Sequence, residues 1–119
     1  MDYKKNIGSW GENVAEEYLI RSGYQILRKN YRTPYGEIDL IARKETTIIF
    51  VEVKTRLSIN YGLPEEGVTY KKQTHMVSAA EAYLQDNNNW AGDWRIDVIA
   101  IRKNNNQPAE ITHFENALH

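Results

Sequence analysis

The chain has 119 residues, a common size for one domain, so we expect a single domain over residues 1–119 with its core between about residues 8 and 114. Hydrophobic residues make up 41% of the chain, no apolar run approaches the length of a membrane span, and the first residues lack the apolar core of a secretory signal, which favours a cytoplasmic protein without a membrane partner. The absence of cysteine excludes a disulfide framework and a thiolate metal site, and the net charge of −1 means that any nucleic-acid partner must be bound by local basic clusters.

A first helix is predicted from Ser9 to Gly23. Ser9 and Glu12 have the spacing of a capping box, in which each satisfies a free amide of the first turn. Gly11 lies within the apolar face and would let the helix approach another element closely. That face is formed by Trp10, Val14, Ala15, Tyr18 and Leu19. Glu12 borders the face, and its capping role would explain it without any further function.

Three strands are predicted next. The first runs from Tyr24 to Tyr31 and leads into a turn at residues 33–36. The second ends near Ala42. Residues 43–46 form a short reversal into the third strand, which predicts an antiparallel hairpin.

A second helix is predicted to begin near Thr69, after a loop at residues 58–67 that is rich in glycine, proline and asparagine. Gln73 falls in the middle of its apolar face. The other members of that face are Met76, Ala80, Tyr83 and Leu84. A polar amide at this position either bonds to buried backbone or points into a functional cleft.

Two further strands complete the chain. Trp94 to Ile101 predicts a buried strand that contains Asp97, and Ala109 to Phe114 predicts an edge strand. The order helix, three strands, helix, two strands predicts an α/β sandwich around one mixed sheet. His75 and His113 each lack a second metal ligand at a suitable spacing, so we expect surface or capping roles for them.

Charged residues end the third strand. Alternation places Glu52 and Lys54 on the same face as Phe50, and buried charges require a partner or a metal. If the hairpin turn has an even number of residues and Arg43 pairs with Thr46, or Ala42 with Thr47, Asp39 lies opposite Phe50 and diagonal to Glu52, with backbones about 7–8 Å apart. A turn of three residues would place Asp39 on the other face.

Two carboxylates at that separation could hold one divalent cation, Mg²⁺ or Mn²⁺, with Glu12 as a third acid. Such an ion activates water and neutralises charge in phosphodiester hydrolysis, and Lys54 could orient or activate the water or stabilise the transition state. The acid-x-lysine pattern is not specific by itself, because residues 2–4 also match it, and a plain ion pair between Glu52 and Lys54 is the alternative.

Four motifs occur together in this chain: Gly36–Leu40, Phe50–Arg56, Gly8–Glu12 and Lys72–Gln73. Their combination resembles the YraN-like family of bacterial proteins, which is similar to archaeal Holliday-junction resolvases and belongs to the restriction-endonuclease-like superfamily. Ile38 stands where the characteristic pattern of the superfamily has a proline before the aspartate.

The resemblance implies a restriction-endonuclease-like αβββαβ sandwich with a central mixed sheet flanked by helices. It also implies that Asp39 and Glu52 bind magnesium, that Lys54 is catalytic, that Glu12 is an additional acid and that Gln73 supports the site. Related junction resolvases act as dimers, so a homodimer is an expectation by analogy.

The leading functional hypothesis is a magnesium-dependent DNA endonuclease, with branched or damaged DNA as a candidate substrate. The alternative is a non-catalytic nucleic-acid-binding or adaptor module that retains the nuclease fold, with basic clusters that contact phosphates. A third hypothesis is a structural domain in which Glu52 and Lys54 only pair with each other.

Overall fold

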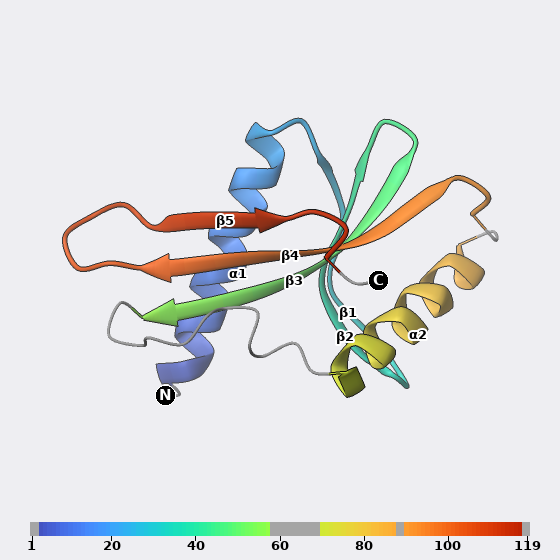
Figure 1. Ribbon diagram of the computed structural model, residues 1–119, viewed down its shortest axis with the longest axis horizontal. Helices are drawn as coiled ribbons and strands as arrows, with labels where there is room; N and C mark the ends of the chain where they lie inside the picture. Colours follow the sequence, from blue (N-terminus) through green and yellow to red (C-terminus); the bar gives the residue numbers. More distant parts are fainter. Residues whose placement is uncertain (1–2, 58–69, 88–89, 118–119) are drawn as a thin grey trace.

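The computed structural model describes residues 3–57, 70–87 and 90–117, which form a five-stranded mixed sheet and two helices (Figure 1). The elements are α1 (Tyr3–Arg21), β1 (Gln25–Thr33), β2 (Gly36–Lys44), β3 (Thr47–Leu57), α2 (Tyr70–Asp86), β4 (Asp93–Lys103) and β5 (Glu110–Phe114). The mixed α/β class and the order of the elements are confirmed. In the described part of the chain no helix is both long and apolar enough to cross a membrane.

The strands are ordered β1-β2-β3-β4-β5 across the sheet. Only β3 and β4 are parallel, from Thr47 opposite Asp93 to Leu57 opposite Lys103, and the other neighbours are antiparallel. A parallel pair needs a crossover connection, which here contains α2. The pair is covered on both sides, which explains why the middle of β4 is buried without alternation. The predicted edge position of β5 is confirmed.

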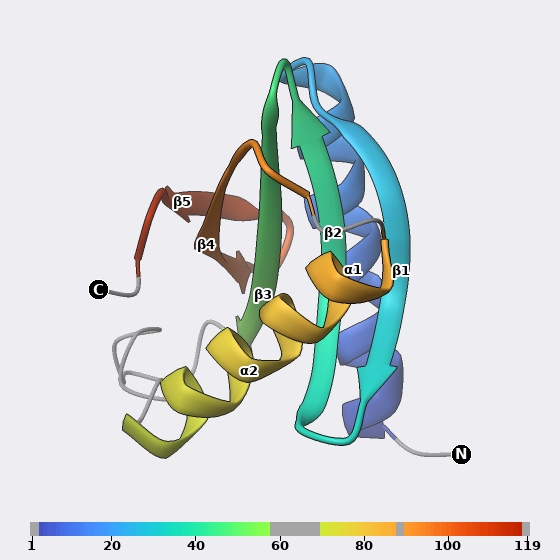
Figure 2. The same cartoon turned by 90° about the vertical axis from the view of Figure 1, so that its right-hand side faces the viewer.

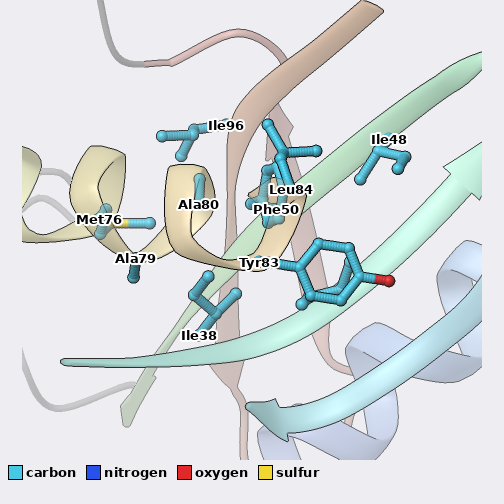
Figure 3. Close-up of a cluster of buried hydrophobic side chains, with 10 residues drawn as sticks. Ile38, Ile48, Phe50, Met76, Ala79, Ala80, Tyr83, Leu84 and Ile96 are labelled. Atoms are coloured by element: carbon cyan, nitrogen blue, oxygen red, sulfur yellow. The ribbon is translucent and has the colours of Figure 1, made fainter. Parts of the chain in front are cut away.

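The two helices cover opposite faces of the sheet (Figure 2). Alternation along β3 directs Ile49 and Val51 to the α1 side, and Ile48 and Phe50 to the α2 side. Figure 3 shows the α2 side, where Tyr83 and its neighbours on the helix pack over the strands. The predicted apolar face of the second helix is therefore confirmed, because its four apolar members all belong to this buried cluster: Met76, Ala80, Tyr83 and Leu84.

The end of α1 was predicted better than its beginning. The helix begins at Tyr3, so Ser9 lies inside it and the predicted capping box at Ser9 and Glu12 is wrong. At the other end Gly23 has φ 92°, its amide bonds to Ile20 O at 3.1 Å, and the next amide bonds to Leu19 O at 2.9 Å. This is a Schellman motif, which needs a left-handed residue that glycine supplies without steric cost.

The apolar face of α1 packs on β3 at Gly11. A β-carbon at this position would collide with Thr55 Oγ1 and lie 3.1 Å from Thr55 Cβ. The prediction that Gly11 permits a close approach is confirmed, and the residue beside it, Glu12, is thereby held near the sheet.

The hairpin between β2 and β3 has a two-residue turn at Glu45 and Thr46, so the prediction of an even-numbered turn is confirmed. The predicted register is wrong by two residues, because Arg43 pairs with Ile48 and not with Thr46. Continuing the observed register places Asp39 opposite Glu52 instead of Phe50. The sequence contains no Asn-Gly or Asp-Gly pair here that would have marked the centre of the turn.

Candidate active site

Asp39 lies where β2 and β3 separate. The last paired residues of this ladder are Leu40 and Val51, and beyond them the Asp39 Oδ2 atom accepts a hydrogen bond from the Val53 amide at 2.8 Å. Alternation along β2 also breaks here, since Leu40 packs on the α1 side and Ile38 on the α2 side. The carboxylate thus replaces a backbone partner at the point where the strand changes direction, which fixes its position.

Glu52 is 5% exposed and lies among two lysines. Lys54 Nζ is 3.5 Å from Glu52 Oε1, and the ammonium group of Lys72, from the first turn of α2, contacts the same oxygen. Since even-numbered residues of β3 face α2, Glu52 and Lys54 point toward the helix that carries Lys72. The predicted pair of Glu52 and Lys54 is present, but as part of a group of three charges.

Asp39 and Glu52 both line one cleft of about 410 Å³. Its lining residues are Tyr35, Gly36, Glu37, Asp39, Glu52, Lys71, Lys72, His75, Met76 and Ala79. The cleft therefore lies between the β1–β2 turn and the beginning of α2, which are at the same end of the sheet in Figures 1 and 2. Lys54 does not line the cleft but contacts Glu52, which does.

The charges in the cleft shift one another's pKa values. Burial, followed by repulsion from Glu52, raises the pKa of Asp39 to about 7, against the opposing effect of the Val53 hydrogen bond. Burial and the neighbouring ammonium of Lys72 lower the pKa of Lys54. Burial also disfavours the charged form of Lys72, but the Glu52 carboxylate outweighs it and raises the pKa of Lys72. The pKa values of the two lysines in the site are thus shifted in opposite directions.

Glu12 approaches the site from α1 but does not line the cleft. With its amide nitrogen oriented toward the acids, Asn30 donates to Glu12 Oε1 and to Glu37 Oε1, each at 3.1 Å. Burial, then repulsion from Glu37 and Glu52, raises the pKa of Glu12. Asn30 has φ 51°, a conformation that asparagine tolerates better than most residues, and it lies in β1 between the partners of Ile38 and Leu40.

Gln73 is half-buried in the first turn of α2 and does not line the cleft. Lys72, its neighbour in the chain, is the residue of that turn that reaches Glu52. The resemblance implied a supporting role for Gln73, and it included Lys72 in the same motif without a role in the site. The available signal was a lysine beside Gln73 in the predicted first turn, but its contact with β3 depends on how α2 crosses the sheet.

The donor set for a metal is small. Across residues 3–57, 70–87 and 90–117, no three His, Asp or Glu side chains are close enough together to hold an ion. Asp39 and Glu52 are the inner pair of carboxylates in the cleft, and the third acid on its wall, Glu37, is exposed. Two carboxylates suit Mg²⁺, which usually keeps several waters and takes further oxygens from a phosphate.

A second polar cluster lies on the α1 side of the sheet around Asp97, which is 0% exposed. Asp97 accepts hydrogen bonds from Arg95 Nε at 3.0 Å and from the Asn116 amide at 2.9 Å, and His113 Nε2 lies 2.7 Å from it. The other ring nitrogen of His113 is 2.9 Å from the hydroxyl of Tyr18 in α1. The prediction of a surface or capping role for His113 is therefore wrong, because β5 brings it to the buried acid. His75 is exposed, as predicted.

The fold and the site together define the class of protein: a mixed α/β domain in which two carboxylates and two lysines meet where neighbouring strands separate. The model of a family described as "Uncharacterised protein family UPF0102" matches residues 11–101, and the chain belongs to this family. The match includes every residue of the cleft, and it confirms the YraN-like resemblance at the level of the family.

Relatives of this family match most of the chain. A UPF0102 protein of Chloroherpeton thalassium is 45% identical over 90% of this chain and 88% of its own. Those of Syntrophotalea carbinolica and Caldicellulosiruptor bescii are 44% and 48% identical, over 98% and 82% of this chain and 95% and 82% of their own. These names state a family and no activity.

Proposed function

We propose that the protein is a DNA endonuclease that hydrolyses phosphodiester bonds with Mg²⁺ or Mn²⁺, and that its mixed sheet has the restriction-endonuclease-like arrangement. The observation that carries the proposal is the meeting of Asp39 and Glu52 in one cleft, with Lys54 and Lys72 on the Glu52 carboxylate. An acid pair with a lysine beside it can perform metal-assisted hydrolysis of a phosphodiester, because the acids can hold the metal and the lysine can act on the attacking water.

The two carboxylates fit a hard divalent cation. One oxygen of Asp39 is engaged by the Val53 amide, which leaves the other for a ligand. The raised pKa of Asp39 reflects burial and repulsion from Glu52, and a bound cation would relieve that repulsion. Asp39 and Glu52 would hold the ion, and the bound ion would neutralise charge on the phosphate and lower the pKa of a coordinated water.

The two lysines would divide the remaining work. Lys54, whose pKa is lowered by burial and by Lys72, is suited to accept a proton from the attacking water. The water oxygen then bonds to phosphorus as the bond from phosphorus to the leaving sugar oxygen breaks, and that oxygen takes a proton from solvent. Lys72, which Glu52 keeps charged, is suited to contact a non-bridging phosphate oxygen.

Glu12 and Gln73 would act around this centre. Glu12 would orient the site through Asn30, to which Glu37 also bonds, and would add negative charge near the cation. Gln73 would support the first turn of α2, from which Lys72 extends.

The test is a cleavage assay with linear duplex, single-stranded and four-way DNA in the presence of Mg²⁺ or Mn²⁺. Asp39→Asn and Lys54→Met should each lower the rate by about 10²-fold or more, because each removes a group that acts on the reacting atoms. Glu17→Gln, at an exposed acid of α1, is the matched control and should keep full activity. Full cleavage by both site variants would refute the assignment.

One observation favours a second candidate, a non-catalytic nucleic-acid-binding or adaptor module. Glu52 is already paired with two lysines, so its charge is balanced without a metal. Calorimetric titration with Mg²⁺ separates the two candidates. An endonuclease should show binding that Asp39→Asn and Glu52→Gln abolish, whereas an adaptor should show none that depends on these residues.

A further inference from the structure

Tyr35 is an exposed aromatic residue on the wall of the cleft. It lies in the β1–β2 turn, is 52% exposed, and lines the same cleft as Asp39 and Glu52. Among the described residues its ring packs on no other aromatic ring, and its hydroxyl has no hydrogen-bond partner. Packing of the fold therefore does not explain a large apolar side chain at this point.

The turn holds Tyr35 in a fixed place. The hydroxyl of Thr33 accepts a hydrogen bond from the Tyr35 amide at 3.0 Å and donates one to Gly36 O at 2.9 Å. Gly36 has φ 139°, which residues with a β-carbon rarely adopt. A turn closed in this way fixes the backbone from which the side chain of Tyr35 extends, so the turn need not become ordered on binding, which favours a recognition role.

The size of the cleft restricts what can enter it. Its volume of about 410 Å³ lies in the range of sites for small molecules and single cofactors, which includes one nucleotide. A duplex is much larger than a cleft with room for about one nucleotide, so paired and stacked bases cannot enter it. Only a nucleotide that has left the base stack could place its phosphate near the acids and its base within the cleft.

The charges of the cleft suit such a ligand. Lys71, Lys72 and His75 line it from α2 and supply cationic and hydrogen-bonding groups for phosphate oxygens. Of the acids, Glu37 is paired with Arg32 Nε at 3.2 Å, and Glu52 is paired with the two lysines described above. Tyr35 offers the larger of the two aromatic rings that line this cleft, the other being the imidazole of His75, and a base can stack on its face.

We propose that the cleft binds one unpaired nucleotide beside the phosphate to be cut, with its base stacked on Tyr35. This inference rests on the proposed function and names the class of substrate: DNA with an unpaired position at a strand end, flap, loop or junction. Stacking is tolerant of base identity, so the site selects an unstacked nucleotide and not a sequence. Loss of one stacked base corresponds to a loss of about 5–150-fold in affinity.

The test measures binding without cleavage, with Ca²⁺ in place of Mg²⁺. The probes are a duplex with a short single-stranded gap that contains 2-aminopurine, and a fully paired duplex with 2-aminopurine at the same position. Tyr35→Ala should weaken binding of the gapped probe by about 5–150-fold and remove the change in 2-aminopurine fluorescence, and leave binding of the paired duplex unchanged. Tyr35→Phe should behave as the wild type, since it keeps the ring. Ile20→Ala, at a residue of α1 that is 54% exposed and outside the cleft, is the matched control and should have no effect.

The inference would be overturned if Tyr35→Ala lost the same affinity for the gapped probe and for the paired duplex. It would also be overturned if Tyr35→Phe bound the gapped probe as weakly as Tyr35→Ala. The outcome is distinguishable from that of the proposed function. If neither the wild type nor any variant cleaves DNA but the Tyr35-dependent fluorescence change remains, the nucleotide site stands and the nuclease proposal fails. If cleavage depends on Asp39 and Lys54 but neither binding nor fluorescence depends on Tyr35, the nuclease stands and the nucleotide site fails.

Discussion

The close approach of α1 to β3 at Gly11 gives a sharp prediction about stability. An alanine in the middle of a helix is favoured over glycine by about 1 kcal/mol when nothing crowds it. At residue 11 the new methyl group would collide with Thr55 Oγ1 and lie 3.1 Å from Thr55 Cβ and 3.2 Å from its Cγ2. Rotation about χ1 of Thr55 can move its Oγ1 but leaves its Cβ 3.1 Å from the new methyl group, and the strain of such overpacking is about 1–3 kcal/mol. The strain offsets or exceeds the helix gain, so we expect Gly11→Ala to lower the free energy of unfolding by up to about 2 kcal/mol.

Urea unfolding at 25 °C, followed by circular dichroism, measures this change as a shift in the midpoint at constant slope. Gly8→Ala is the matched control within the same helix, because a β-carbon there would meet no atom within 4 Å. It should raise the free energy of unfolding by about 0.5–1 kcal/mol. In a Thr55→Ala background the hydroxyl and methyl groups are gone, and Gly11→Ala should be less destabilising by about 0.5–1.5 kcal/mol. If Gly11→Ala stabilised the protein as much as Gly8→Ala, the packing of α1 on β3 described here would be wrong.

Two further predictions concern titrating groups. Asp97→Asn should lower the free energy of unfolding by about 2–4 kcal/mol in urea at pH 7, because it leaves Arg95 without its buried carboxylate. Despite burial, hydrogen bonds from His113 and Arg95 hold the pKa of Asp97 below its ordinary 3.8. The contribution of Asp97 to the free energy of unfolding is therefore present above pH 3.8 and is lost as the pH falls through the folded pKa. The variant should lose less stability below about pH 4 than the wild type, and equal losses would contradict this. Asp39 has the opposite sign: its pKa is raised from 3.8 to about 7, so the native state binds the extra proton and stability falls as the pH rises between those values. Thermal midpoints from pH 4.5 to 8 should show this fall in the wild type and a smaller one in Asp39→Asn, whereas identical profiles would refute the shift.

Local patterns in the sequence predicted the elements and the faces that they bury. The 3.6-residue period of α2 predicted the contacts of Met76 and Tyr83, and alternation in β3 predicted that Glu52 and Lys54 would share the side of Phe50. These predictions depend on one element at a time. They succeeded because burial of an apolar face fixes the rotation of a helix or strand about its own axis.

Relations between elements were harder to predict. A turn of two residues allows several centres, each of which moves the register by two residues and keeps the same face, so the sequence could place Asp39 on the side of Glu52 but could not decide its partner. The contact of Lys72 with Glu52 and the bridge of Asn30 between Glu12 and Glu37 require the crossing of α2 and the bend of β2. No pattern within either segment contains that information.

The capping box at Ser9 failed for a different reason. The spacing from Ser9 to Glu12 is correct for a cap, but α1 continues back to Tyr3, so no free amides are present at Ser9 to be capped. A capping role therefore cannot explain the position of Glu12. Its carboxylate instead bonds through Asn30 to Glu37, and repulsion from Glu37 and Glu52 contributes to its raised pKa.

The position of the site follows from the separation of β2 and β3. Beyond Leu40 and Val51 the ladder ends, which leaves the Val53 amide to Asp39 and opens space between the strands and α2. Within that space two lysines contact Glu52, and burial and repulsion from Glu52 raise the pKa of Asp39 to about 7. Protonation of Asp39 and the ammonium of Lys72 thus offset the negative charge of the acids where, in the proposed endonuclease, a divalent cation would offset it. In that proposal, binding of the cation would displace the proton and release Lys72 for a phosphate, so the groups that stabilise the site without a ligand would be the ones that a ligand releases.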